Sequence, residues 1–329
     1  MIGLYYPEIN FNEIKKKLKN FNIINSLFDL INKLEIKLIY LGKEIELTKI
    51  ISFYTSRNIY LKNFNVTYKE DYIKELHEVI NWVIIHKSNQ LKGIASDKYL
   101  ACKYVQFKLG KNLCQHRIAV YENLEQLNYE ELSKFGDIVL KVSNSCWKKI
   151  LISKTAKKEK YMKLLKEFKN LYLKTEHGLI EAQFFHLYAK KRIVVEKQFT
   201  PREYLYEFKF FILNNAIRFI YLLFYKYKKI YKLFYDTNFN FIFKDKKYDI
   251  TPLNLASLFN KNTLEKLKEY AIKLSEDFPN FVRVDLYLFK NQIYFSELTF
   301  ASCRGLYFHR NEKFILDCMK NFSRIDDYY

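Results

Sequence analysis

The chain has 329 residues, of which 49% are hydrophobic and 18% aromatic. This length and composition are enough for a substantial buried core, so an intrinsically disordered tail protein is excluded. The net charge of +20 favours an anionic partner, but 47 of the 56 basic residues are Lys and only nine are Arg. Because Arg supplies bidentate recognition of bases and phosphates, the charge gives little support to a nucleic-acid-binding protein.

Cysteine spacing and hydropathy indicate the setting of the protein. Five cysteines occur without a CxxC pair or the Cys and His spacing of a zinc site: Cys102, Cys114, Cys146, Cys303 and Cys318. We therefore expect reduced thiols in a reducing compartment. The longest apolar run, residues 219–225, is far shorter than the about 20 residues that cross a bilayer, and the N-terminus lacks a basic region followed by an apolar stretch. The sequence predicts a soluble, cytoplasmic protein without a transmembrane segment.

The chain divides into two regions by its hydrophobic pattern. Residues 1–90 are expected to form mainly Lys-rich amphipathic helices, most clearly over 71–86, where apolar residues recur at helical spacing. No function is assigned to this region. Residues 91–329 alternate between helices and short β-rich runs.

In chain order, the second region predicts a mixture of strands and helices. A helix capped by Ser96 or Asp97 is expected to run to Leu109, and Asn214 and Asn215 mark a hairpin turn. The other expected strands are 137–142, 150–153, 192–199, 206–213, 216–225, 281–289 and 293–300, and the other helices are 158–174, 262–278 and 311–322. Strands in hairpins with segregated helices are typical of an α+β architecture.

The last two expected strands carry charges in otherwise apolar runs. Alternation puts Arg283 and Asp285 on one face of the first strand. A three-residue loop, 290–292, would place Asp285 opposite Glu297 and Arg283 opposite Thr299, whereas a two-residue loop would put the carboxylates on opposite faces. Directly opposed residues have Cβ atoms roughly 4.5–5.5 Å apart, a gap that suits Mg²⁺ with its hard oxygen ligands. On this hairpin alone, a structural ion pair of Arg283 with one carboxylate is an equally good interpretation.

Two further apolar strands end in charged residues. Lys141 ends the strand 137–142, where a lysine either snorkels to solvent or meets an anion, and snorkelling is favoured for a single lysine. Glu196 and Lys197 end the strand 192–199. A carboxylate beside a backbone edge suits a nucleobase amino group, and an edge strand that reaches solvent is an equal alternative.

Two more charged pairs have a functional and a structural interpretation. Glu207 and Lys209 alternate within one strand, so they share a face that must be polar or occupied. Asp97 and Lys98 stand at a helix start, which is either an anion site or, more commonly, a simple cap.

The order of these motifs along the chain is more specific than any one of them. It runs Asp-Lys at 97–98, a strand ending in Lys141, Glu-Lys at 196–197, Glu-Phe at 207–208, Arg-x-Asp at 283–285 and Glu-x-Thr at 297–299. This succession resembles the ATP-grasp superfamily, in which D-alanine–D-alanine ligases show a similar order. Segments such as DKYLACKYV, IVLKVSN and YEFKFFILNN resemble the TupA-like branch for teichuronopeptide biosynthesis. The resemblance covers about residues 80–310.

The resemblance implies an ATP-grasp fold that holds the nucleotide between two α+β subdomains, about 91–190 and 191–329, after the mainly helical N-terminal region. It also implies site residues. The ATP phosphates would contact Lys98 and Lys141, the adenine Glu196, Lys197 and Phe199, and the ribose Glu207, with Lys209 beside it. Mg²⁺ would be held by Asp285, Glu297 and Thr299, and Arg283 would act with Lys141 in catalysis, facing the transferred phosphoryl group.

The sequence departs from the family pattern at two places. Thr299 replaces the usual Asn, which leaves one ligating oxygen. The loop 143–149 contains Trp147 and no glycine where the family has a glycine-rich phosphate loop, so it does not offer the same backbone amides. Lys148 or Lys149 would supply a point charge instead.

The sequence therefore predicts an ATP- and Mg²⁺-dependent ligase that activates a carboxylate as an acyl phosphate and joins it to an amine. Resemblance to the branch suggests a small-molecule or nucleotide-sugar carboxylate, such as a uronic acid, in the synthesis of a capsular or teichuronic-type polysaccharide. Arg304, Gly305 and His309 are candidates for binding this substrate, although Gly305 fits an ordinary turn equally well. Three alternatives stay open: an ATP-grasp kinase, a non-catalytic binder of anionic glycan, and, with the least support, a nucleic-acid-binding protein.

Overall fold

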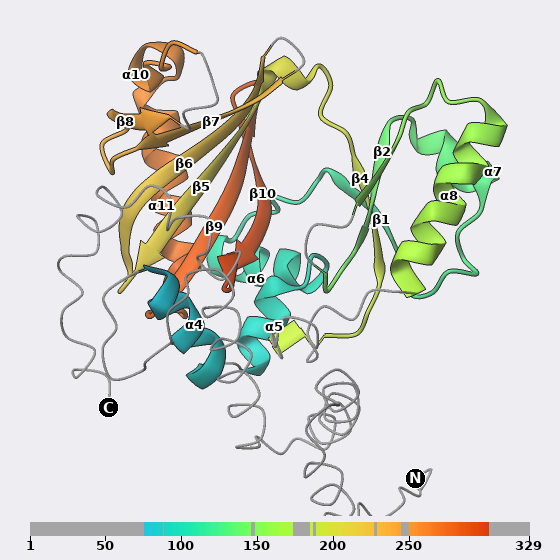
Figure 1. Cartoon of the computed structure of the whole chain (residues 1–329), viewed down its shortest axis with the longest axis horizontal. Helices are drawn as coiled ribbons and strands as arrows, with labels where there is room; N and C mark the ends of the chain where they lie inside the picture. The colour runs from blue at the N-terminus through green and yellow to red at the C-terminus, as the bar shows by residue number, and fades with distance from the viewer. Residues whose placement is uncertain are drawn as a thin grey trace, which may run out of the picture. The chain divides into compact units, whose positions relative to one another are not determined.

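The computed structural model describes residues 76–87, 89–145, 149–173, 185–186, 189–226, 229–244 and 250–302 (Figure 1). The chain divides into two compact units, Met1–Thr48 and Lys49–Tyr329, and every described residue belongs to the second. The expected helix at 311–322 and most of the expected helical region 1–90 lie outside the described residues.

A four-stranded antiparallel sheet has the order β1-β4-β2-β3. Its strands are β1 (Arg117–Tyr121), β2 (Ile138–Val142), β3 (Lys149–Ile152) and β4 (Ile193–Lys197). Helix α8 (Lys158–Leu173) packs on it through Tyr161, Leu165 and Phe168, whose spacing puts them on one helix face. The short α7 (Tyr129–Leu132) and η1 (Ser133–Phe135) precede β2. The expected first subdomain ended near residue 190, but β4 of this sheet begins at Ile193. The division into subdomains stays a prediction.

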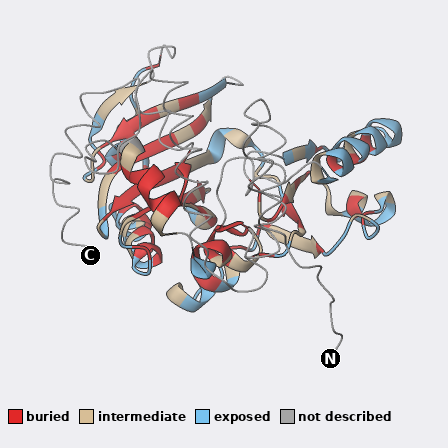
Figure 2. Ribbon diagram, turned by 60° about the horizontal axis from the view of Figure 1, so that its bottom comes forward, coloured by how far each residue is buried: buried red, intermediate tan, exposed pale blue. Residues whose placement is uncertain are grey.

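A six-stranded antiparallel sheet has the order β10-β9-β5-β6-β7-β8. Its strands are β5 (Leu205–Leu213), β6 (Ala216–Lys226), β7 (Lys229–Tyr235), β8 (Phe241–Lys244), β9 (Phe281–Phe289) and β10 (Gln292–Thr299). The helices α10 (Leu255–Leu258) and α11 (Lys261–Ser275) follow β8, and η3 (Arg202–Tyr204) precedes β5. Buried residues are concentrated in this sheet and on the inner faces of its helices (Figure 2). The two sheets with their helices confirm the expected α+β class.

The turn between β5 and β6 was correctly predicted from Asn214 and Asn215. Both residues have positive φ, 53° and 54°, as a two-residue hairpin turn requires. Three strands were not predicted, namely β1, β7 and β8. They are short or interrupted by Lys, so alternation is weak in them.

The hairpin of β9 and β10 differs from the expectation in its loop. The loop has two residues, Lys290 and Asn291, with φ of 50° and 63°, and Gln292 pairs with Phe289. A β-bulge between Phe295 and Glu297 then shifts the register by one residue. The expected three-residue loop is therefore wrong. The expected pairing is nevertheless confirmed, because Glu297 lies opposite Asp285 and Thr299 opposite Arg283.

Three helices precede β1: α4 (Leu76–His86), α5 (Gln90–Ser96) and α6 (Leu100–Leu109). The predicted cap of α6 is confirmed for Asp97, whose Oδ1 accepts hydrogen bonds from the backbone N–H groups of Tyr99 and Leu100 at 2.9 and 2.8 Å. Among the helices described, the longest has 16 residues, and none combines the length and apolar character that a membrane span needs.

One disulfide corrects an expectation about the cysteines. Cys102 of α6 is bonded to Cys114, which precedes β1. The expectation of reduced thiols is therefore wrong for these two residues. The 12-residue separation of this pair matches no local cysteine motif, because the fold brings the two residues together.

Candidate active site

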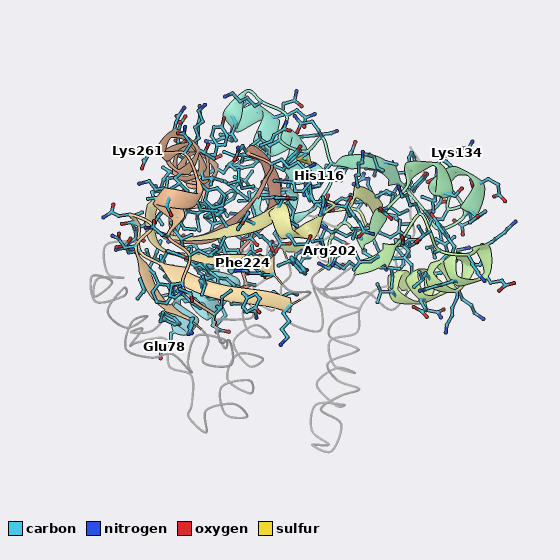
Figure 3. All side chains as sticks on the ribbon, turned by 90° about the horizontal axis from the view of Figure 1, so that it is seen from above. Glu78, His116, Lys134, Arg202, Phe224 and Lys261 are labelled. Carbon is cyan, nitrogen blue, oxygen red and sulfur yellow. A yellow bond between two sulfur atoms is a disulfide. The ribbon has the colours of Figure 1, made fainter. Side chains whose placement is uncertain are left out.

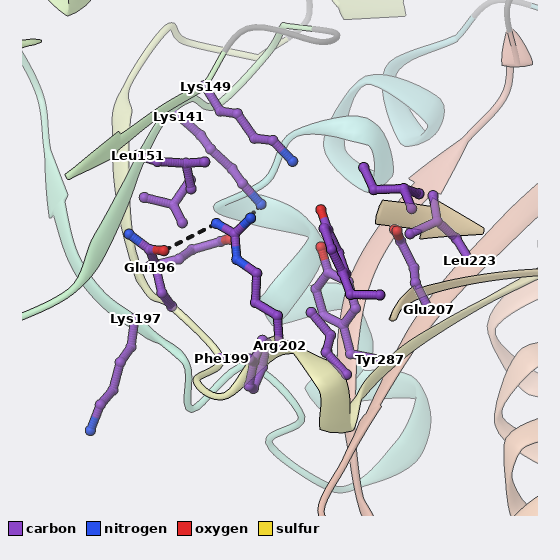
Figure 4. A pocket seen from close by; sticks show the side chains of 15 residues that line it. Lys141, Lys149, Leu151, Glu196, Lys197, Phe199, Arg202, Glu207, Leu223 and Tyr287 are labelled. Carbon is purple, nitrogen blue, oxygen red and sulfur yellow. Dashed lines mark hydrogen bonds and ion pairs between the residues drawn. The ribbon is translucent and has the colours of Figure 1, made fainter. Parts of the chain in front are cut away.

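A pocket of about 180 Å³ lies between the two sheets (Figure 4). Its wall on the side of the four-stranded sheet comes from β2, β3 and β4, and its other wall comes from β5, β6, β7 and β9. Its charged and polar lining residues are Lys141, Lys149, Glu196, Lys197, Gln198, Arg202 and Glu207. Of the residues predicted to bind ATP, the structure thus brings Lys141, Glu196, Lys197, Phe199 and Glu207 together around one pocket.

Glu196 is the buried anchor of the first wall. Its side chain is 4% exposed and forms an ion pair with Lys141 through Oε2, while its Oε1 accepts from Arg117 Nε at 3.0 Å. Burial alone would raise the pKa of Glu196, but the charges of Lys141 and Arg117 outweigh burial and hold that pKa well below its usual range. Glu196 therefore stays ionised and fixes Lys141 at the pocket.

Two lysines face each other in the same wall. Lys141 of β2 is the cross-strand partner of Lys149 of β3, and both line the pocket. Glu196 offsets the charge of Lys141, whereas burial and the neighbouring Lys141 lower the pKa of Lys149. A phosphate beside the pair would relieve the remaining repulsion. The predicted alternative, Lys148, lies outside the described residues.

Arg202 crosses the pocket from one wall to the other. Its guanidinium donates to Gln198 Oε1 at 3.2 Å and lies over the ring of Tyr225 of β6, 5.3 Å from the ring centre. Gln198 is itself fixed, because its Nε2 donates to two backbone carbonyls, at 2.8 and 3.2 Å. A nucleobase between the walls must displace or stack on Arg202. Arg202 was not among the predicted site residues, because no motif or alternation in the sequence distinguishes it.

An aromatic cluster borders the pocket beside Phe199. The centre of the Phe199 ring lies 5.4 Å from that of Tyr287 and 4.9 Å from that of Tyr294. His116 packs on Phe199 with ring centres 5.4 Å apart, and His116 and Arg202 lie where the two sheets meet (Figure 3). Burial lowers the pKa of His116 to about 3, so this ring is neutral at pH 7. The cluster is an apolar surface on which a base can stack.

The charged residues of the β9 and β10 hairpin converge on Arg283. Its Nε and one terminal nitrogen donate to the two oxygens of Asp285 at 2.7 Å each, and the same terminal nitrogen reaches Glu297 at 2.7 Å and Thr299 at 3.0 Å. Lys209 of β5 also forms an ion pair with the fully buried Asp285. The structure therefore brings all three predicted metal ligands and the predicted catalytic arginine into one cluster.

The pocket and this cluster are connected. Glu207, which lines the pocket, forms an ion pair with Lys209 at 2.7 Å, and Lys209 contacts Asp285. Lys141 is also close enough to affect Glu297. Burial opposes the shift, but the charges of Arg283, Lys209, Lys98 and Lys141 lower the pKa of Glu297 to about 2.

The donor set of the cluster fits Mg²⁺. Asp285 and Glu297 are opposed on one face, and Glu297 is ionised at neutral pH. The hydrogen bonds to Glu297 from described residues use Oε1, which leaves Oε2 for a ligand. The described ranges hold no group of three or more His, Cys, Asp or Glu residues able to bind a metal. An ion here would take further oxygens from a bound phosphate, as Mg²⁺ commonly does.

The other predicted site residues have different positions. Lys98 Nζ donates to the carbonyls of Val142 at 3.2 Å and Ser143 at 3.5 Å, and to that of Ser145, so it closes the loop after β2. Its predicted phosphate contact stays a prediction. The expected substrate residues Arg304, Gly305 and His309 lie outside the described residues.

Comparisons with known proteins found one matching family profile and several solved structures of limited similarity. No curated protein matches the chain in sequence. A D-alanine–D-alanine ligase from Bacillus anthracis has a similar structure, with 14% identity, a TM-score of 0.41 and coverage of 70% of this chain and 68% of the ligase. An L-amino acid ligase from Bacillus licheniformis shows 10% identity and a TM-score of 0.42, over 82% of this chain and 60% of that one. The family profile described as TupA-like ATPgrasp matches residues 78–316. Since that match spans well over half of the chain, this protein belongs to the TupA-like ATPgrasp family.

Proposed function

We propose that this protein is an ATP-dependent carboxylate–amine ligase. The observation that carries the proposal is that the pocket holding the lysine pair, Lys141 and Lys149, is also lined by Glu207. Glu207 leads through Lys209 to Asp285, which Arg283 joins to Glu297. Phosphoryl transfer to a carboxylate needs positioned cations rather than a covalent protein group. In the reaction, the carboxylate attacks the γ-phosphorus of ATP to give an acyl phosphate and ADP. An amine then attacks the acyl carbon and releases phosphate.

Each wall of the pocket has a role in this reaction. Phe199 and Tyr287 would hold the base, Glu207 the ribose hydroxyls, and Lys141 with Lys149 the phosphates. The positions of these five residues in the pocket lining support the proposed roles.

The hairpin cluster would act at the transferred group. Asp285, Glu297 and Thr299 would hold Mg²⁺, which neutralises phosphate charge when bound. Arg283 would release one carboxylate contact and bind the oxygens of the acyl phosphate. Its buried position among carboxylates keeps it charged and oriented for that step.

The substrates are proposed from the family and from charge. A uronic acid, free or as a nucleotide sugar, would be the carboxylate, held by Arg304, Gly305 and His309, and an amino acid or amino alcohol would be the amine. The product would be an amide decoration of a capsular or teichuronic-type polysaccharide. ATP as a co-substrate is consistent with a cytoplasmic reaction.

The test is to incubate the protein with ATP, Mg²⁺ and a panel of uronic acids and nucleotide-linked uronic acids, with hydroxylamine as the amine. Hydroxylamine converts an acyl phosphate into a hydroxamate, so the expected result is a hydroxamate with equal amounts of ADP and free phosphate. With Glu297→Gln, none of the hydroxamate, ADP and free phosphate should form. A stable phosphorylated product without hydroxamate would replace the ligase with a kinase. Carboxylate binding without ATP turnover would replace it with a non-catalytic binder.

A further inference from the structure

Arg117 connects three parts of the site that lie far apart in the sequence. It begins β1, and its side chain is only 5% exposed. Its Nε donates to Glu196 at 3.0 Å, one terminal nitrogen donates to the backbone carbonyl of Lys98, and the other donates to the backbone carbonyl of Ser296. One planar guanidinium therefore contacts the nucleotide wall, the start of α6 and the β10 strand at once.

The contact with Ser296 occurs at the bulge of β10. In the register of β9 and β10, Phe295 pairs with Leu286 and Glu297 with Asp285, so Ser296 is the extra residue. The extra residue of a bulge is left outside the regular ladder. Arg117 binds its carbonyl, and the guanidinium also lies 5.3 Å from the ring centre of Phe295.

The segment that carries Arg117 is itself held against β10. The N–H of Phe295 donates to the carbonyl of Leu113 at 2.8 Å, and the N–H of Arg117 donates to the carbonyl of Cys114 at 2.8 Å. The disulfide joins Cys114 to Cys102 of α6. β10 is an edge strand of its sheet, so this segment covers the edge next to the bulge.

We propose that Arg117 is a positioning residue that couples the nucleotide wall to the metal-binding strand. By holding the Ser296 carbonyl it stabilises the bulge, and the bulge puts Glu297 on the same face as Asp285. By holding Glu196 it also fixes the partner of Lys141. This inference rests on the proposed function for the roles of Lys141 and Glu297, but the clamp on the bulge is a property of the ligand-free chain.

Lysine cannot replace Arg117, because it cannot donate hydrogen bonds to all three of these acceptors at once. The three acceptors lie in three directions around the guanidinium, and each accepts a hydrogen bond from a different nitrogen. A lysine ammonium keeps the charge for Glu196 but lacks the planar fork and the reach to hold two carbonyls as well. Arg117→Lys therefore separates charge from geometry.

The test compares Arg117→Lys with the wild type and with Arg192→Lys. Arg192 is a matched control, because it directly precedes β4 and the contacts described for its side chain are with Glu122 at 2.8 Å, the Lys190 carbonyl and the Tyr99 ring, none of which belongs to β10. The first measurement is amide hydrogen exchange of the peptide containing Ser296 and Glu297, without ligand. The second is the Mg²⁺ concentration that gives half-maximal binding of a fluorescent ATP analogue.

Arg117→Lys should speed exchange in that peptide and raise the required Mg²⁺ concentration about tenfold, as loss of a residue that orients metal ligands does. Arg192→Lys should change neither. Unchanged exchange in Arg117→Lys overturns the clamp, whether or not the wild type binds nucleotide. Faster exchange with an unchanged Mg²⁺ requirement overturns the coupling. Failure of the wild type to bind the analogue would overturn the proposed function and this coupling, while the exchange result still decides the clamp. If Arg117→Lys does not fold, Arg117→Gln with Arg192→Gln as its control tests the clamp by the same hydrogen-exchange measurement, with the charge beside Glu196 removed as well.

Discussion

At the scale of residues, cations and carboxylates in this site hold one another in place before any ligand arrives. Lys141 is bound by Glu196, and Asp285 by Arg283 and Lys209. Breaking such a buried pair by removing one partner is costly, because the other charge is left uncompensated. Substitutions in the site therefore differ in how cleanly they test function.

We expect Lys141→Ala and Lys149→Ala each to weaken ATP binding. A charge-assisted contact with phosphate contributes on the order of 1.5–3 kcal/mol, or about ten- to a hundredfold in affinity. Isothermal titration calorimetry measures the dissociation constants, and Lys134→Ala, an exposed lysine outside the pocket, serves as the control. An unchanged affinity in both variants would remove the phosphate-binding role of these lysines.

Glu297→Gln is the cleaner of the two metal-site variants. The Glu297 side chain is 36% exposed, so its substitution should cost less stability than substitution of a fully buried carboxylate. Loss of the metal ligand should abolish ATP turnover. Asp285→Asn should also abolish turnover, but Asp285 is fully buried between Arg283 and Lys209, so unfolding should become easier by about 3–5 kcal/mol. Urea denaturation and an ADP assay measure both effects. Wild-type turnover in Glu297→Gln would remove the metal assignment.

At the scale of elements, α5 buries a lysine whose ammonium has no hydrogen-bond partner among the described residues. Lys92 is 4% exposed, with its Nζ 5.6 Å from the ring centre of Phe300. Burial, with a smaller effect from Lys87, lowers the pKa of Lys92 to about 7. Between about pH 7 and the ordinary lysine pKa of 10.5, the unfolded chain therefore binds more protons than the folded one. Lys92 therefore lowers the free energy of unfolding most at pH 7 and below, and this destabilisation decreases as the pH rises.

Lys92→Met should therefore stabilise the protein, because it removes the cost of burying the amine and keeps similar volume. The gain should be on the order of a few kcal/mol near pH 6.5 and should shrink steadily towards pH 10. Urea denaturation at several pH values measures it, with Lys87→Met as the control. A gain that does not change with pH would mean that packing, rather than charge, is responsible.

The sequence predicted elements well where alternation or turn residues were strong. Asn214 and Asn215 marked their turn, and Asp97 its cap. The β9 and β10 pairing was predicted with the wrong loop, because a three-residue loop without a bulge and a two-residue loop with one give the same pairing of Asp285 and Glu297. A bulge leaves no residue signature that distinguishes the two. Arg117, Arg202 and His116 were missed because their roles arise only when distant segments meet.

At the scale of the whole molecule, the pocket is built from both sheets, so a nucleotide that fills it must contact both. A ligand that binds only the folded state stabilises it by mass action, by about 2.7 kcal/mol at a concentration one hundred times its dissociation constant. The melting temperature of the wild type should therefore rise with ATP and Mg²⁺ together, and less with ATP alone. Glu297→Gln should remove the additional effect of Mg²⁺. Differential scanning calorimetry measures these shifts, and no shift with saturating ATP and Mg²⁺ would contradict nucleotide binding.

The two-residue turn and the bulge of the β9 and β10 hairpin also limit which insertions and deletions the gene can tolerate. Glu297 faces Asp285 because two single-residue offsets cancel. If one residue between the turn and Glu297 is lost, the carboxylates stay opposed only if the bulge disappears as well. If one residue is gained there, they stay opposed only if the turn also lengthens by one residue. Relatives of this chain should therefore keep turn residues that tolerate positive φ, such as Asn, Asp or Gly, and should change the length of this interval only together with the bulge or the turn.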